Sequence, residues 1–121
     1  MKIFALRPML WTDDLSGSVE FYTRVLGFQV GEHNDEWGWA SLYKDSVEIM
    51  LARPNEHTPF TRPTFTGSFY FNLEDVEAAW NDLKEKAKIC YELETFEYGM
   101  REFAIYDNNG YILQFGQEVE N

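Results

Sequence analysis

The chain has 121 residues, of which 45% are hydrophobic and 26% charged, a length that suits one domain and a composition that excludes disordered, low-complexity and collagen-like classes. Its 21 acidic and 10 basic residues give a net charge of −11, which disfavours nucleic acid and anionic membranes, and no apolar stretch reaches the roughly 18 residues of a membrane span. The single cysteine excludes an intramolecular disulfide, and the N-terminus lacks the apolar core of a secretion signal, so we expect a cytoplasmic location.

The first half of the chain predicts a strand, a helix and three more strands. Residues 4–11 have a strand pattern, and the following apolar residues recur at helical spacing between an N-cap at Asp14 and a C-cap at Gly27. The later strands are predicted to start at 28–30 and to cover 37–43 and 47–52, with turns at 34–36 and 44–45.

The second half repeats this order after a proline-rich linker, predicted over residues 54–66. The N-cap candidates Asp14 and Asp75 lie 61 residues apart, as do the matching apolar positions of the two helices. The strands of this half are predicted at 68–73, 89–95, 101–106 and 111–115, with a hairpin turn at 108–110. We therefore expect one α+β domain made of two βαβββ modules, at about residues 1–53 and 67–121.

Alternation along the strands assigns their side chains to faces. The face toward each helix should be apolar, as Phe69 and Phe71 indicate, whereas the opposite face collects polar and aromatic side chains. Such a mixture is typical of a concave ligand site, although an ordinary solvated face is the alternative. The candidate ligand-binding residues of this opposite face are Arg7, Met9, Trp11, Glu48, Met50, Ser68, Tyr70 and Gln114.

Other residues that can carry chemistry fit plainer roles. His33 and His57 lack metal-binding spacing, so neither is expected to be catalytic, and Cys90 is expected to be a small buried residue. Glu102 is a candidate site carboxylate, but in so acidic a chain we expect it on the plain surface, and Asp107 should serve the hairpin turn. The candidate rim residues, for which a structural role is equally expected, are Trp37, Trp39, Phe60 and Tyr98.

Three segments resemble the vicinal oxygen chelate superfamily, which includes glyoxalase I, extradiol dioxygenases and the fosfomycin and bleomycin resistance proteins. Residues 14–28 are similar to its opening helix, and residues 98–103 and 107–110 are similar to its C-terminal signature, especially in the bleomycin resistance branch. The resemblance implies two mixed sheets that curl into a cup, the glyoxalase/bleomycin resistance fold. It also implies a homodimer in which each cup combines the N-terminal module of one chain with the C-terminal module of the other.

Enzymes of this superfamily hold a divalent metal in the cup, typically with His or Gln, Glu, His and Glu. The resemblance places Arg7, Glu48, Ser68 and Gln114 at these positions, or Pro8 in place of Arg7 if the alignment shifts by one residue. Arginine has no lone pair for a cation, serine is a poor ligand and glutamine is neutral, so we expect no metal and no other cofactor. Arg7 should instead pair with Glu48 and supply the positive centre.

This combination favours a metal-free binding protein similar to the bleomycin resistance proteins, which give antibiotic resistance by sequestering a small molecule. Its ligand should be planar or cationic, because it could stack on aromatic side chains while the acidic surface attracts it. One alternative is a glyoxalase-like lyase or isomerase, or a dioxygenase-like enzyme, with an altered metal site or with Glu48 as a base. Another is a divergent member with a regulatory ligand. No catalytic residue is assigned, and the sequence leaves the identity of the ligand open.

Overall fold

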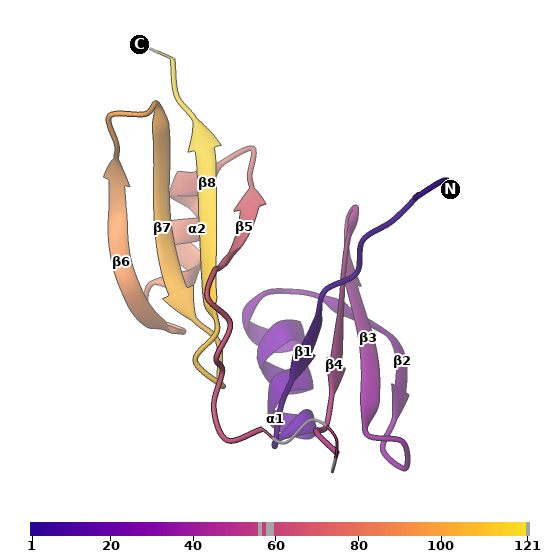
Figure 1. Ribbon diagram of the computed structural model, residues 1–121. Helices are drawn as coiled ribbons and strands as arrows, with labels where there is room; N and C mark the ends of the chain where they lie inside the picture. Colours follow the sequence, from indigo (N-terminus) through magenta and orange to yellow (C-terminus); the bar gives the residue numbers. More distant parts are fainter. Residues whose placement is uncertain (56, 58–59, 121) are drawn as a thin grey trace. The chain divides into compact units, whose positions relative to one another are not determined.

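The computed structural model describes residues 1–55, 57 and 60–120. The chain forms two compact units, Met1–Arg62 (unit 1) and Pro63–Asn121 (unit 2), and each consists of a helix and a four-stranded mixed sheet (Figure 1). The strand orders, β1-β4-β3-β2 and β5-β8-β7-β6, are equivalent. The predicted α+β class with two βαβββ modules is therefore confirmed. Within the described residues, no helix combines the length and the apolar character that a bilayer span requires.

Unit 1 begins and ends its helix where the sequence predicts. The Asp14 carboxylate accepts a hydrogen bond from the Gly17 backbone N–H at 2.9 Å, and Gly27 adopts a φ of +79° at the C-terminal end, a conformation that glycine adopts without strain. The elements of this unit are β1 (Met9–Trp11), α1 (Leu15–Glu20), its π-helical continuation η1 (Phe21–Val25), β2 (Gln29–Asn34), β3 (Trp39–Lys44) and β4 (Val47–Ala52).

Unit 2 repeats this construction. The Asp75 carboxylate accepts from the Ala78 N–H at 3.1 Å, so the two aspartates 61 residues apart have the same capping role. Asp107 accepts from the backbone N–H groups of Asn109, Gly110 and Tyr111 at 2.8, 2.9 and 2.9 Å, which confirms its predicted role in the hairpin turn. The elements are β5 (Phe69–Asn72), α2 (Val76–Leu83), β6 (Lys88–Thr95), β7 (Met100–Tyr106) and β8 (Ile112–Glu118).

Several predicted boundaries were wrong. The first strand covers only Met9–Trp11 instead of 4–11, because only these residues pair with β4. The second strand continues to Asn34, whose side chain then accepts the Trp37 N–H at 2.9 Å and caps the following turn. Consequently β3 starts later than predicted. The turn from β3 to β4 falls on residues 45–46, and Asp45 has a φ of 52°.

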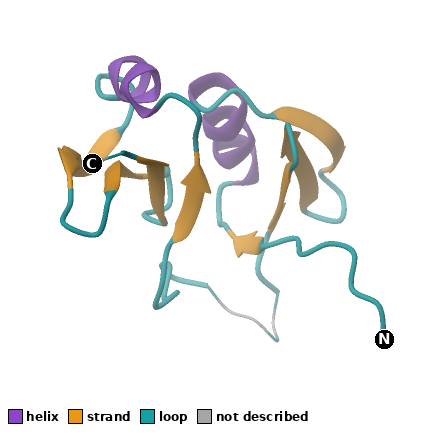
Figure 2. Ribbon diagram, turned by 90° about the horizontal axis from the view of Figure 1, so that it is seen from above, coloured by secondary structure: helices purple, strands orange, loops and turns teal. Residues whose placement is uncertain are grey.

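The helix of each unit covers one face of its sheet, as the view from above shows (Figure 2). In unit 2, the buried Phe103 packs against Phe115 and against Trp80 of α2, with ring centroids 5.2 Å apart in both pairs. In unit 1, the buried Leu10 and Ile49 lie on the helix-covered face, as alternation predicts. The core therefore occupies one face of each sheet, and the opposite face remains available for ligand chemistry.

Candidate functional site

The predicted pairing of Arg7 with Glu48 in unit 1 is confirmed. The Arg7 guanidinium forms an ion pair with the Glu48 carboxylate, and together they line an open groove of about 380 Å³ between the segment Phe4–Leu6 and the turn that joins β3 to β4. Their side chains are 51% and 34% exposed. The pair therefore lies in contact with water.

This exposure sets the expected strength of the ion pair. We expect Arg7→Ala and Glu48→Gln each to lower the free energy of unfolding by less than about 1 kcal/mol, with a coupling in the double variant that added salt weakens. Urea unfolding of the four variants at low and high salt measures this cycle. Strictly additive effects would show that the two residues are not partners.

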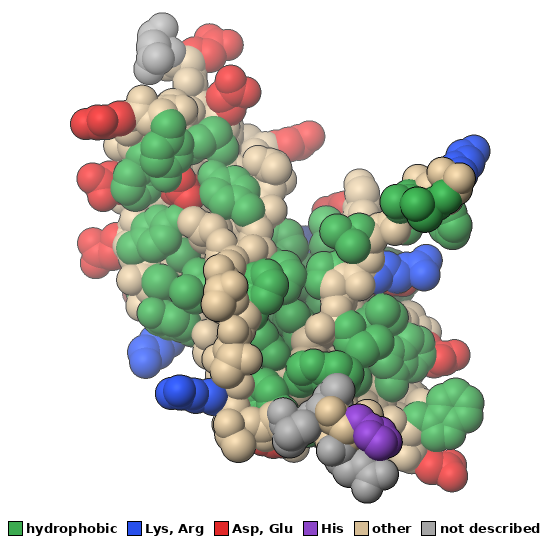
Figure 3. All heavy atoms as spheres, in the orientation of Figure 1, with side chains coloured by type: hydrophobic (Ala, Val, Ile, Leu, Met, Phe, Trp, Pro, Cys, Tyr) green, Lys and Arg blue, Asp and Glu red, His purple; other side chains and the backbone are tan. Residues whose placement is uncertain are grey.

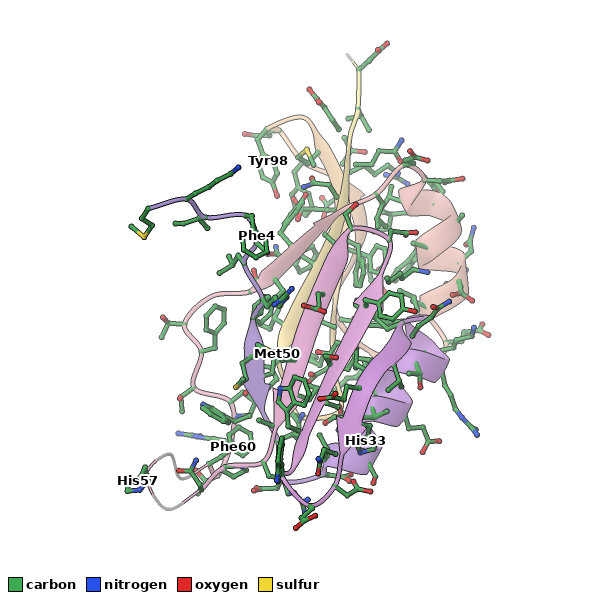
Figure 4. The ribbon with its side chains drawn as sticks, turned by 90° about the vertical axis from the view of Figure 1, so that its right-hand side faces the viewer. Phe4, His33, Met50, His57, Phe60 and Tyr98 are labelled. Carbon is green, nitrogen blue, oxygen red and sulfur yellow. The ribbon has the colours of Figure 1, made fainter. Side chains whose placement is uncertain are left out.

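The other candidates of unit 1 share the face of this pair. Met9 and Met50 are partners across β1 and β4, and Trp11 follows on the same face, where it pairs with Ala52. Figure 4 shows Met50 beside β1 on this face. The structure thus brings the five candidates of unit 1 onto one sheet face, with the charged pair at one end.

In unit 2, a hydrogen-bonded network joins Ser68 and Gln114 to a carboxylate. The Ser68 hydroxyl donates to the Gln114 side-chain oxygen, and Gln114 Nε2 donates to the Tyr91 hydroxyl at 2.7 Å. The Tyr91 hydroxyl donates to Glu102 Oε2 at 2.6 Å, and the Tyr98 hydroxyl donates to Glu102 Oε1. Glu102 is the end point of both branches.

The expectation of a surface position for Glu102 was wrong, since the residue is only 1% exposed. Its register partner on β8 is Gly116, which has no side chain, and Tyr98 of the β6–β7 turn (Figure 4) donates a hydrogen bond to Glu102. The alternation that placed Gln114 on this face also places Glu102 there, because Ala104 pairs with Gln114 and Glu102 lies two residues earlier on β7. That signal was available in the sequence.

Tyr70 completes the surroundings of Glu102. It pairs with Gln114 across β5 and β8, and its ring lies over Gly116, where an added Cβ would collide with the Tyr70 hydroxyl. Glycine at position 116 therefore allows this close approach. Burial, followed by the negative charge of Glu102, raises the pKa of Tyr70.

The other two tyrosines also have raised pKa values. The hydrogen bond to Glu102 is the main cause that raises the pKa of Tyr98, to about 12, and burial followed by the bond to Glu102 raises the pKa of Tyr91. Both hydroxyls consequently stay protonated at neutral pH and keep donating to the carboxylate.

Phe96 adds an aromatic ring to this group. Its ring stacks on Tyr98 with centroids 5.5 Å apart and meets Tyr91 edge-on at 5.9 Å. On the face of unit 2 turned away from α2, hydrophobic side chains gather over β6, β7 and β8, and acidic side chains lie along the left and upper margins of this group (Figure 3). We define the Glu102 cluster as Tyr70, Tyr91, Phe96, Tyr98, Glu102 and Gln114.

The metal that enzymes of similar fold hold does not fit these residues. The Ser68 hydroxyl is hydrogen-bonded to the Gln114 side-chain oxygen. Arg7 places a positively charged side chain at a position where a metal site needs a ligand. In unit 2, Gln114 of β8 pairs with Tyr70 of β5. The equivalent strands of unit 1 are β4 and β1, in which Met50 pairs with Met9, so a methionine stands at the position equivalent to Gln114. Within the described part of the chain, no three His, Cys, Asp or Glu side chains are grouped to hold a metal ion. A hard divalent cation would find too few oxygen ligands here.

Several other candidates lie apart from these groups. His33 is on the edge strand β2, where Nε2 lies 2.9 Å from Asp35 Oδ1, and His57 is on the segment that follows β4 in the chain (Figure 4). Cys90 on β6 is half-buried, whereas the sequence predicted a small buried residue. The candidate rim residues separate: Trp37 is exposed in the turn before β3, Trp39 is half-buried on β3, Phe60 is half-buried outside the strands, and only Tyr98 joins the Glu102 cluster.

Comparison with known proteins agrees with this architecture. The profile of the Glyoxalase/Bleomycin resistance protein/Dioxygenase superfamily matches residues 5–115. A protein of unknown function from Agrobacterium tumefaciens str. C58 is similar in structure, with a TM-score of 0.80 and 20% identity over 98% of this chain and 97% of that one. No curated protein matches the chain.

Two further solved structures have the same fold. A glyoxalase/bleomycin resistance protein/dioxygenase from Nocardioides gives a TM-score of 0.83 and 17% identity, over 100% of this chain and 87% of that one. TioX from Micromonospora sp. ML1 gives a TM-score of 0.77 and 20% identity, over 94% of this chain and 98% of that one. At these identities the likeness extends to the fold alone.

Proposed function

Because this chain belongs to the Glyoxalase/Bleomycin resistance protein/Dioxygenase superfamily, we propose that it is a metal-free protein that binds a planar or cationic small molecule. The observation that carries this proposal is the Glu102 cluster, in which aromatic rings surround a buried carboxylate on an open sheet face. An aromatic surface backed by negative charge favours such ligands.

We propose ligand-binding residues on the sheet face of each unit that is turned away from its helix. Unit 2 contributes the Glu102 cluster and Ser68, and unit 1 contributes the surface around the Arg7–Glu48 pair. Sequestration of an antibiotic, as in the bleomycin resistance proteins that the sequence resembles, is the role that we propose for this binding. The proposed residues of unit 1 are Arg7, Met9, Trp11, Glu48 and Met50.

The proposal predicts that the purified protein holds no stoichiometric divalent metal. After loading with Zn²⁺ or Mn²⁺ and dialysis, elemental analysis should find far less than one metal ion per chain, because the strand positions lack the necessary donors. An equal sample analysed before dialysis is the control. One tightly held ion per chain would contradict the proposal and favour a lyase, isomerase or dioxygenase with an altered metal site.

We also propose that the chain forms a homodimer. Both sheets are open, and unit 1 exposes the apolar residues Ile3, Phe4, Leu6 and Met9, which a partner would shield from water. Light scattering in dilute buffer should give about twice the chain mass of 14.3 kDa, as expected for a symmetric pair. A monomer at all concentrations would contradict a site that two chains build together.

A further inference from the structure

We propose that the exposed aromatic face of unit 2 binds an organic ammonium ion, which Tyr70 and Tyr98 contact and the buried Glu102 attracts. This inference rests on the proposed function and specifies the chemical class of its ligand. The two rings are accessible, with Tyr98 67% and Tyr70 38% exposed, while the carboxylate beneath them is almost wholly buried.

The first argument is the charge of Glu102. The hydroxyls of Tyr91 and Tyr98 and the Gln114 amide, which lies 3.4 Å away, donate to it, and all three donors are neutral. The hydrogen bond to Glu102 that contributes to the raised pKa of Tyr70 also comes from a neutral hydroxyl. None of the ion pairs within the described residues includes Glu102. A buried charge without a counterion is costly, even with its hydrogen bonds made. A cationic ligand would supply the missing charge.

The second argument is the orientation of the hydroxyl groups. The Tyr98 proton points at Glu102, so the Tyr98 oxygen can only accept further hydrogen bonds. A phenol that donates to a carboxylate also carries more electron density on its ring, which strengthens the attraction between the ring face and a cation. The accessible surface of the cluster therefore favours N–H donors and positive charge.

The third argument separates organic cations from metal ions. A metal ion would need direct access to several oxygen atoms, but the one carboxylate is only 1% exposed. An ammonium ion with methyl substituents keeps its charge while its apolar surface packs against aromatic rings, as in methylammonium-binding aromatic cages. The net charge of −11 adds long-range attraction for any cation.

The test compares choline with 3,3-dimethyl-1-butanol, its neutral isostere, by NMR titration of the full-length protein with the tyrosine ring signals as readout. We expect choline to bind at least about tenfold more tightly than the alcohol. Glu102→Gln should weaken choline binding about tenfold, whereas Glu94→Gln should change it by less than about twofold. Glu94 is the matched control because it is the register partner of Glu102 on β6 and is exposed.

A second pair of variants keeps the carboxylate and is informative even if Glu102→Gln fails to fold. Tyr98→Leu removes the ring and should weaken choline binding severalfold, while Tyr98→Phe keeps the ring and should retain most of it. Equal affinity for both probes, or no choline binding, would overturn the inference. Binding of a planar neutral dye without choline binding would overturn the ligand class but leave the proposed function standing. A stoichiometric bound metal would overturn the proposed function itself.

Discussion

Replacing Glu102 with alanine is expected to lower the free energy of unfolding by about 3 kcal/mol, because three donors lose their common acceptor and a side chain is removed from a buried position. Urea unfolding at pH 7 measures this difference. The matched variant Glu94→Ala removes an exposed carboxylate from the neighbouring strand and should change stability by less than about 0.5 kcal/mol. Equal effects of the two variants would show that Glu102 is not the centre of the network.

The same variant should change the titration of Tyr98. In the wild type this tyrosinate forms with a pKa of about 12, and without Glu102 the pKa should return toward its ordinary value of 10.0. Because the raised pKa stabilises the protonated hydroxyl in the folded protein, its contribution to stability is complete below pH 10 and is lost as the pH rises toward 12. Tyrosinate absorbance measures the titration, and an unchanged curve in the variant would exclude the Tyr98–Glu102 bond.

Replacing Gly116 with alanine is expected to destabilise the protein by about 1–3 kcal/mol, because the new methyl group displaces the Tyr70 ring from above β8. The displacement should also weaken choline binding, since Tyr70 then leaves the neighbourhood of Glu102. In a Tyr70→Ala background the ring is absent, and Gly116→Ala should be close to neutral there, within about 0.5 kcal/mol. A double-mutant cycle of unfolding free energies tests this coupling. The same cost in both backgrounds would show that the ring does not occupy this space.

Local patterns in the sequence determined the elements of the fold. The helices are predicted by the spacing of apolar residues between a capping aspartate and a residue that ends the helix. Each capping hydrogen bond joins residues three apart in the chain, as Asp14 and Asp75 show. The duplication follows because both halves carry these signals in the same order. The resemblance to a superfamily depended on the same local motifs, and the matching profile confirms it over residues 5–115.

Strand alternation went one step further and placed Gln114 on the face opposite the helix. It could not show what covers that face. The sequence therefore predicted a plain surface position for Glu102, and the length of β1 was likewise overestimated because pairing with β4, rather than composition, decides where that strand starts.

Only the tertiary structure decided that Glu102 is the centre of the candidate site. Its hydrogen bonds come from the Tyr98 hydroxyl of the β6–β7 turn and the Tyr91 hydroxyl of β6, and the Tyr70 ring lies over its register partner Gly116 on β8. These groups belong to separate segments of unit 2. The Arg7–Glu48 pair shows the same division, since the family resemblance and the strand faces predicted the pairing but not its exposure. The physical reason is that alternation assigns a side chain to a face through the geometry of its own strand, whereas burial and hydrogen bonding depend on atoms brought there by other elements.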